Sequence, residues 1–205
     1  MEIEAKFRVD DGQTFDALLK LAVLGPYHLS PAPDPEDQRN TYFDTADGRL
    51  QARHYGLRIR DLGARRIATL KGPSRGTGAL HERDEWEAEI RDDDQAMGWP
   101  ASEARDRTLE LLGGAPMIPI LSIRTMRRHI YVARGGADIA EISLDEGTIS
   151  AGAREQPFRE LEIELLGGAT RADLEAIVEL LRARYPLIPE ERSKLARGMA
   201  LLAGR

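Results

Sequence analysis

The chain opens with Glu2-Ile3-Glu4-Ala5-Lys6-Phe7-Arg8-Val9, a stretch in which charged and apolar side chains alternate. Successive side chains of a β-strand point to opposite faces. The stretch therefore predicts a strand with one apolar face and one face that carries both acidic and basic groups.

Similar alternation recurs along most of the chain. Such strands in antiparallel-compatible order, with few helices between them, predict an α+β protein built on a large sheet or barrel. Strands are expected at Met1–Val9, Arg39–Asp44, Tyr55–Asp61, Arg65–Lys71, Leu80–Ile90, Ile120–Ala133, Asp138–Asp145, Thr148–Ala151 and Phe158–Leu166.

Three segments have the apolar spacing of helices, and they lie near the two ends of the chain. They are Phe15–Leu24 and the ranges 172–185 and 190–203. Residues 92–114 are expected to form a partly helical insertion, in which Ser102 is a candidate N-cap. We expect residues 1–205 to form a single domain, with the two C-terminal helices spanning about 172–203.

Composition limits the classes of protein to consider. The 205 residues include 41% hydrophobic and 31% charged residues, which is ordinary for a globular protein. No apolar run approaches the ~20 residues that span a bilayer, so no membrane partner is expected. There is no cysteine, and no secretory signal is visible, so a cytoplasmic location is expected. The net charge of −6 argues against general binding of nucleic acid.

The charged faces of the expected strands allow two interpretations. They can be the solvated face of an open sheet, or they can close on a shared cavity. Acidic residues gather on some strands and basic residues on others, although like charges two positions apart cost stability. Paired carboxylates suit Mg²⁺ or Mn²⁺, and arginines and lysines suit phosphate oxygens. A metal–polyphosphate complex would satisfy both sets.

Several short motifs, in order, resemble those of the CYTH domains, also called triphosphate tunnel metalloenzymes. The N-terminal Glu-x-Glu-x-Lys resembles the signature of this family, and the other motifs follow over nearly the whole chain. They are Tyr42-Phe43-Asp44-Thr45, Arg58-x-Arg60, Thr69-Leu70-Lys71, Glu85-x-Glu87, Arg128 ahead of Tyr131, Asp145, Glu162-x-Glu164 and Ser193-Lys194.

The resemblance implies a closed eight-stranded antiparallel β-barrel, open as a tunnel, with polar residues inside and helices packed on the outside. It also implies a metal-dependent enzyme that hydrolyses a linear triphosphate, with Mg²⁺ or Mn²⁺ as cofactor. The C-terminal segment 192–202 is most similar to the bacterial inorganic triphosphatase branch, for which inorganic tripolyphosphate is the expected substrate. In that branch a helical CHAD domain follows, so the chain is expected to be either a stand-alone member or part of a longer protein.

The resemblance also implies roles for individual residues, and Lys6 is given two of them. Its amine is expected to contact phosphate, and with a lowered pKa it would also act as general base. Arg124 shares a face with Arg128 if their strand is regular, while Arg127 points the other way unless a bulge reverses the choice. The metal ligands are expected to be Glu2, Glu4, Glu85, Glu87, Asp145, Glu162 and Glu164. The phosphate-binding residues are expected to be Lys6, Arg58, Arg60, Lys71, Arg124, Arg128 and Lys194.

Other functions remain open on the same residues. One is a class IV adenylyl cyclase, which forms cyclic AMP and pyrophosphate from ATP. The others are hydrolysis of thiamine or nucleoside triphosphates, and a polyphosphate-binding module without catalysis. The carboxylates favour an enzyme, because binding a polyanion requires cations but not so many metal ligands.

Overall fold

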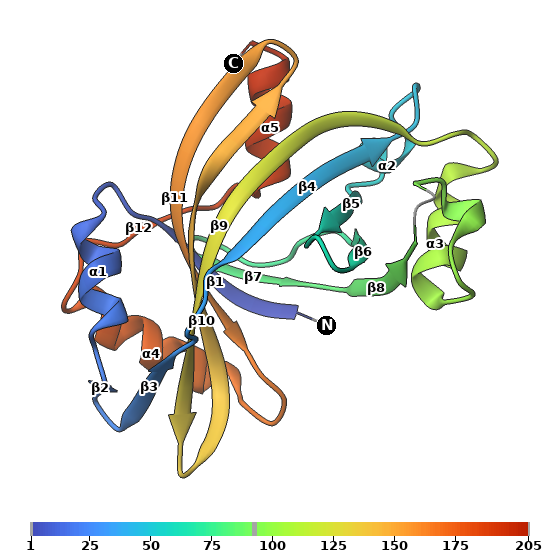
Figure 1. The fold of residues 1–205 in the computed structure, drawn as a ribbon. Helices are drawn as coiled ribbons and strands as arrows, with labels where there is room; N and C mark the ends of the chain where they lie inside the picture. The colour runs from blue at the N-terminus through green and yellow to red at the C-terminus, as the bar shows by residue number, and fades with distance from the viewer. Residues whose placement is uncertain (1, 92–93, 205) are drawn as a thin grey trace.

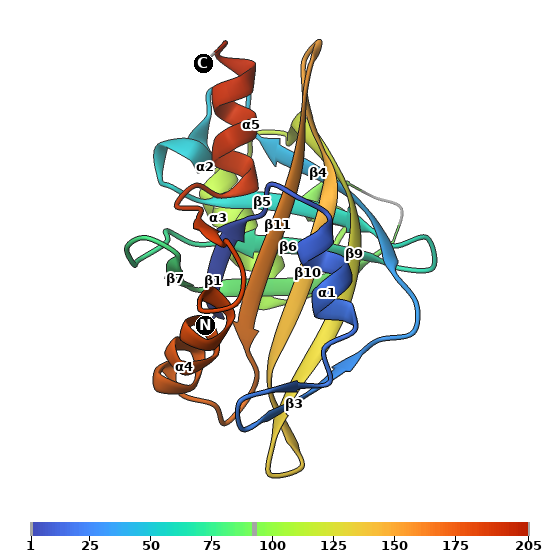
Figure 2. The same cartoon turned by 90° about the vertical axis from the view of Figure 1, so that its left-hand side faces the viewer.

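Strands from distant parts of the sequence pair into one antiparallel sheet that curls round on itself (Figures 1 and 2). The structure is a computed structural model, which describes residues 2–91 and 94–204. The strands of the barrel are β1 (Glu2–Arg8), β4 (Glu36–Asp44), β5 (Gly56–Asp61), β6 (Arg66–Lys71), β7 (Leu80–Arg83), β8 (Glu85–Ile90), β9 (Ile118–Arg134), β10 (Ala137–Ala151) and β11 (Arg154–Leu165).

The sheet closes because its last strand returns to its first. The neighbours run in the order β1-β11-β10-β9-β4-β5-β6-β8, and β7 pairs with β1. Only Asp84 separates β7 from β8, so these two strands together form one side of the barrel. Counted in this way, the described residues form eight sides, as predicted.

The outer face of the barrel is apolar and is covered by helices. Ala5 and Phe7 of β1 pack in a core with α1 (Gln13–Leu19) and α4 (Arg171–Arg182). A second core joins β4, β5, β6 and β8 to α2 (Arg49–Ala52), η1 (Ala96–Gly98) and α3 (Glu103–Leu112). Ser102 caps α3, because its side chain accepts a hydrogen bond from the backbone of Arg105.

The last helix, α5 (Lys194–Leu202), is placed differently. Its residues pack against Ile123, Ile149 and Phe158, which share a face with Asp145 and the other inward side chains. In Figure 1 the helix lies along the ends of β10 and β11, at one end of the barrel. This helix therefore covers part of the inner face, and its first residues point into the barrel.

Some predicted segments have other bounds in the structure. The predicted helix 15–24 ends at Leu19, and Val23–Leu24 (β2) and Tyr27–Pro31 (β3) form a hairpin whose second strand pairs with β9. The strands predicted at 138–145 and 148–151 are the single strand β10. A last short strand, β12 (Ile188–Pro189), pairs with β1. In the described part of the chain, no helix is long and apolar enough to cross a membrane.

Candidate functional site

A cavity of about 1060 Å³ runs through the barrel, and its walls are the charged faces of the strands. Twelve of the predicted site residues line it, and they come from six strands and the start of α5. They are Glu2, Glu4, Lys6, Arg58, Arg60, Lys71, Glu85, Glu87, Asp145, Glu162, Glu164 and Lys194. The inward interpretation of the alternating charges therefore holds for these residues.

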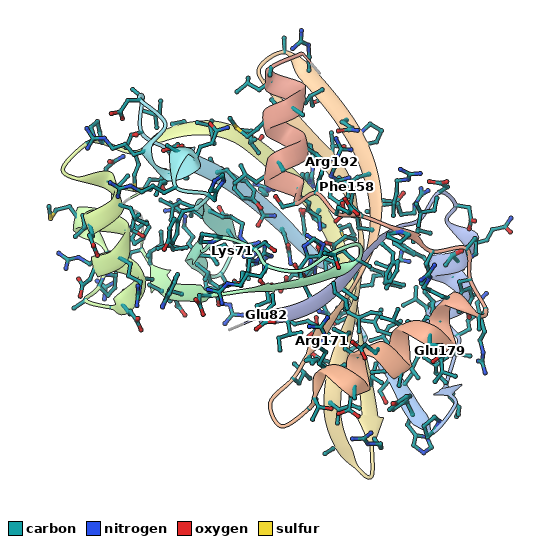
Figure 3. All side chains as sticks on the ribbon, turned by 180° about the vertical axis from the view of Figure 1, so that it is seen from behind. Lys71, Glu82, Phe158, Arg171, Glu179 and Arg192 are labelled. Carbon is teal, nitrogen blue, oxygen red and sulfur yellow. The ribbon has the colours of Figure 1, made fainter. Side chains whose placement is uncertain are left out.

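One cluster of charges lies where the barrel closes, between β1 and β7. Arg83 donates to Glu2 at 2.6 Å and to Glu4 at 3.0 Å. The amine of Lys71 lies 3.1 Å from Glu2 and 2.8 Å from Glu85. Burial alone would raise the pKa of Glu2, but Lys71 and Arg83 outweigh it and hold that pKa well below its usual value. Figure 3 shows Lys71 inside the barrel.

Glu164 lies in the same region with an excess of negative charge around it. Partial burial raises its pKa to about 7, and the carboxylates of Glu2, Glu4 and Glu85 add to the effect. Burial also raises the pKa of Glu85, and Glu2 contributes. This part of the cavity therefore has carboxylate charge that the nearby lysine and arginine do not fully compensate.

A second cluster lies on the wall formed by β9, β10 and β11. Arg127 contacts both oxygens of Asp145 and one oxygen of Glu162, each at 2.6 Å. The amine of Lys194, at the start of α5, lies 2.9 Å from Asp145 and 2.6 Å from Glu162. Burial alone would lower the pKa of Lys194, but Asp145 and Glu162 raise it above its usual value, so the amine is charged.

Lys6 lies between the two clusters. Its side chain is 4% exposed, its amine is 3.7 Å from Glu4, and in the sheet it pairs with Glu162. Burial lowers the pKa of Lys6, and the nearby cations Arg83 and Lys194 lower it further, against the pull of Glu4 and Glu162. The amine is therefore easier to deprotonate than that of a lysine in water.

The arginines of β5 line a third part of the wall. Arg58 donates to Thr69 at 3.2 Å and lies 4.0 Å from Glu87. Arg60 donates to Asn40 at 3.0 Å, and burial, with Arg58 and Arg127 nearby, lowers its pKa to about 10. Neither guanidinium is saturated by carboxylates, so both retain donors for an anion in the cavity.

The predictions for Arg124 and Arg128 are wrong. Both side chains are exposed and neither lines the cavity, and Arg124 pairs with Asp37 on the surface. Arg127 lines the cavity in their place. The reason is a bulge in the β9–β10 hairpin at Ile139, which changes the pairing so that Arg127 lies opposite Asp145.

Sequence reasoning also missed other groups that line the cavity, among them Arg83, His81 and His129. Arg83 alternates in step with Glu85 and Glu87, so its side chain is expected on the same face of the strand. This alternation is the feature of the sequence that could have identified it. His81 lies with its Nε2 3.1 Å from the backbone oxygen of Glu190. His129 has its Nδ1 2.6 Å from Glu141. No ligand spacing marks these two histidines, because the partner of His81 comes from a distant loop and that of His129 from the neighbouring strand β10.

The donor set fits a hard divalent cation. The candidate ligands are carboxylates, which Mg²⁺ and Mn²⁺ prefer. Burial raises the pKa of Glu164, and the neighbouring carboxylates of Glu2 and Glu4 raise it further. Among residues 2–91 and 94–204, no three acidic or histidine side chains are already grouped as a metal site. The oxygens of Glu2, Glu4, Asp145 and Glu162 contact lysines and arginines instead. These ion pairs would have to rearrange for the carboxylates to bind a cation.

Comparison with known proteins gives consistent similarities. The CYTH domain matches residues 1–199. The inorganic triphosphatase of Haemophilus influenzae is 32% identical over an alignment of 168 residues, and the match covers 79% of this chain and 45% of that protein. The chain thus spans less than half the length of this curated relative.

Solved structures share the fold over the whole chain. HpAC1 of Hippeastrum, for which a dominant triphosphatase activity is described, aligns with a TM-score of 0.72 at 22% identity, covering 100% of this chain and 97% of that one. The PH1819 protein of Pyrococcus horikoshii aligns with a TM-score of 0.63 at 23% identity, covering 100% of both chains.

Proposed function

Because this chain belongs to the CYTH domain family, we propose that it hydrolyses a linear triphosphate with the help of Mg²⁺ or Mn²⁺. The observation that carries the proposal is the cavity of about 1060 Å³ lined by both carboxylates and cations. Inorganic tripolyphosphate is the proposed substrate, because the relative from Haemophilus influenzae is an inorganic triphosphatase. We also propose that the chain is one CYTH domain, with residues 92–114 as an insertion.

The cations of the chain would bind and orient the substrate. Arg58 and Arg60 from one wall, and Lys71 and Lys194 from others, converge on the cavity from separate strands and from α5. Phosphoryl transfer depends on positioning and on stabilisation of charge spread over the phosphate oxygens. Arginine offers paired donors to those oxygens, and lysine adds a point charge.

The carboxylates would hold the metal, and Lys6 would move the proton. Glu2, Glu4 and Glu164 are the proposed main ligands, with Glu85, Glu87, Asp145 and Glu162 as further candidates. A divalent cation at these oxygens would offset the triphosphate charge and polarise a phosphoryl oxygen. Lys6, whose pKa is lowered, would accept the proton of the attacking water through its neutral amine.

A panel of three substrates tests the proposal. The purified chain is incubated with Mg²⁺ or Mn²⁺ and with tripolyphosphate, ATP or thiamine triphosphate. Phosphate release from tripolyphosphate well above that from the other two is the expected result. Formation of cyclic AMP and pyrophosphate from ATP would indicate a cyclase. Fastest hydrolysis of thiamine triphosphate would indicate a thiamine triphosphatase. Tight binding without turnover would indicate a binding module.

A matched pair of substitutions tests the ligand assignment. Glu4→Gln removes a charge from the cavity wall and is expected to lower metal-dependent hydrolysis by at least a hundredfold, which is about 3 kcal/mol of transition-state stabilisation. Glu146→Gln makes the same chemical change on an exposed side chain of β10 and should leave the rate unchanged. Circular dichroism checks that both variants fold. Full activity in Glu4→Gln would contradict the assignment.

A further inference from the structure

Two charged side chains are enclosed by protein behind Lys194. Glu160 of β11 is 1% exposed and Arg197 of α5 is 4% exposed. Neither lines the cavity. Removing two charges from water costs several kcal/mol per ion before their mutual attraction is counted. The pair therefore needs a reason for its position next to an amine that is proposed to bind substrate.

The contacts link the pair directly to Lys194. Arg197 donates from Nη2 to Oε1 of Glu160, and Oε2 of Glu160 lies 2.6 Å from the amine of Lys194. The ring of Phe158, labelled in Figure 3, lies 5.4 Å from each of the two cationic groups. Arg197 thus fixes Glu160, and Glu160 contacts Lys194 from the side away from the cavity.

Glu160 differs from the other two carboxylates that contact Lys194. Asp145 and Glu162 line the cavity and are among the proposed metal ligands. A carboxylate that turns toward a bound cation no longer holds the amine. Glu160 does not line the cavity, so it stays beside Lys194 whether or not a cation is bound.

Resting on the proposed function, we propose that Glu160 and Arg197 are positioning residues that hold the amine of Lys194 at the cavity wall, where it meets the phosphate oxygens of the substrate. Lys194 and Arg197 are three residues apart in α5, so they lie on the same face of the helix. The helix therefore supplies both the amine that binds substrate and the guanidinium that fixes the anchor of this amine.

The double variant Glu160→Gln/Arg197→Met tests the proposal. It removes both charges and keeps similar volumes, so neither member of the Glu160–Arg197 pair is left as a buried charge without the other. The KM for tripolyphosphate is expected to rise about tenfold, with a smaller change in kcat. A rise of this size corresponds to the loss of one hydrogen bond between the amine of Lys194 and a charged phosphate oxygen. Calorimetry with tripolyphosphate in EDTA should show a similar loss of affinity without any metal.

The control double variant changes an ion pair that lies between β10 and β11, on the strand that also carries Glu160. Glu146 and Arg159 form a 2.6 Å pair between β10 and β11, and Arg159 is the neighbour of Glu160 in sequence. Glu146→Gln/Arg159→Met should leave KM and metal-free binding within about twofold of wild type, as expected for a surface pair.

A cycle with Lys194→Met separates positioning from general damage. If the pair acts through Lys194, adding Glu160→Gln/Arg197→Met to Lys194→Met should raise KM by less than about twofold more, because coupled residues are not additive. A further tenfold rise would overturn the proposal, and so would wild-type KM and metal-free affinity in the double variant.

A conservative variant covers the case in which the double variant does not fold. Arg197→Lys keeps the charge but loses the planar fork. It should give an intermediate KM, and a KM equal to that of wild type would overturn the proposal. If the wild-type chain neither binds nor hydrolyses tripolyphosphate, the proposed function is wrong, and that result does not depend on any variant.

Discussion

At the scale of single residues, the cavity contains carboxylates in two different electrostatic states. Lys71 and Arg83 hold the pKa of Glu2 low against the effect of burial. Glu164 has no lysine or arginine within ion-pair distance among the described residues, and its pKa is about 7. Neighbouring groups of one chemical type therefore differ in charge near neutral pH, because the partners of each are supplied by different strands.

The raised pKa of Glu164 predicts that this residue lowers the free energy of unfolding as the pH rises. In the folded protein Glu164 keeps its proton up to about pH 7, whereas in the unfolded chain it ionises near pH 4.5. The folded state therefore binds more protons in this window, and its stability falls as the pH rises from about 4.5 to about 7. Glu164→Gln removes this cost, so the advantage of the variant should grow across the window and stay constant above it.

Urea unfolding in EDTA at pH 5, 6, 7 and 8 measures this difference between Glu164→Gln and wild type. EDTA is needed because a divalent cation would itself stabilise the ionised carboxylate. An advantage that is the same at all four pH values would contradict the account of Glu164.

Lys6 gives a second prediction at this scale. Lys6→Met keeps most of the buried apolar stem and removes the amine. If the amine is the general base, kcat for tripolyphosphate should fall by about a hundredfold or more. The acidic limb of the pH–rate profile should disappear with it. An unchanged kcat with a raised KM would leave Lys6 as a phosphate contact only.

At the scale of elements, one bulge decides which arginine enters the cavity. The tight hairpin at Gly135–Gly136 starts with Arg134 opposite Ala137, and without a bulge Arg128 would lie opposite Ser143, on the inward face. The extra residue at Ile139 moves Arg127 opposite Asp145 instead. Because side chains alternate with period two, this one-residue shift exchanges the two faces of β9.

The bulge predicts different effects for two adjacent arginines. Arg127→Lys keeps the charge but loses the fork that contacts Asp145 and Glu162, and the affinity for tripolyphosphate should fall about tenfold. Arg128→Lys changes an exposed side chain and should alter affinity by less than about twofold. Calorimetry with tripolyphosphate measures both. Equal effects in the two variants would contradict the register.

At the scale of the whole molecule, α5 joins the outer structure to the cavity. It packs on the inner face of the long strands, and its first residue, Lys194, belongs to the second cluster. Gly198 allows this approach, because a Cβ at that position would lie 2.6 Å from Leu121 and 3.2 Å from Ile149. The packing of α5 against these strands therefore also fixes the position of Lys194.

A larger side chain at Gly198 should disturb both the packing of α5 and the position of Lys194. Gly198→Val overpacks the contact, and a loss of about 1–3 kcal/mol in the free energy of unfolding is expected. The shift of α5 should also weaken tripolyphosphate binding through Lys194. Ala203→Val, at the exposed end of the same helix, is the control for both measurements. Unchanged stability and binding in Gly198→Val would contradict this packing.

The sequence by itself determined the alternation of the strands, and with it most of the inward residues. Alternation is local, because it depends only on the pleat of each strand. This is why Glu2, Glu4 and Lys6, or Arg58 and Arg60, could be placed on one face before any strand was paired. Resemblance to a family then supplied the closed barrel and the order of its motifs.

Only the tertiary structure decided register, partners and the place of α5. The contacts of Arg83 with two glutamates and the pair Glu160–Arg197 join residues distant in sequence, and the bulge at Ile139 shows only in the pairing of β9 with β10. The hairpin of β2 and β3 likewise replaced a predicted helix end because β3 pairs with β9. The physical reason is common to all of them: these contacts depend on which strands lie side by side, and that arrangement is not encoded in any local stretch.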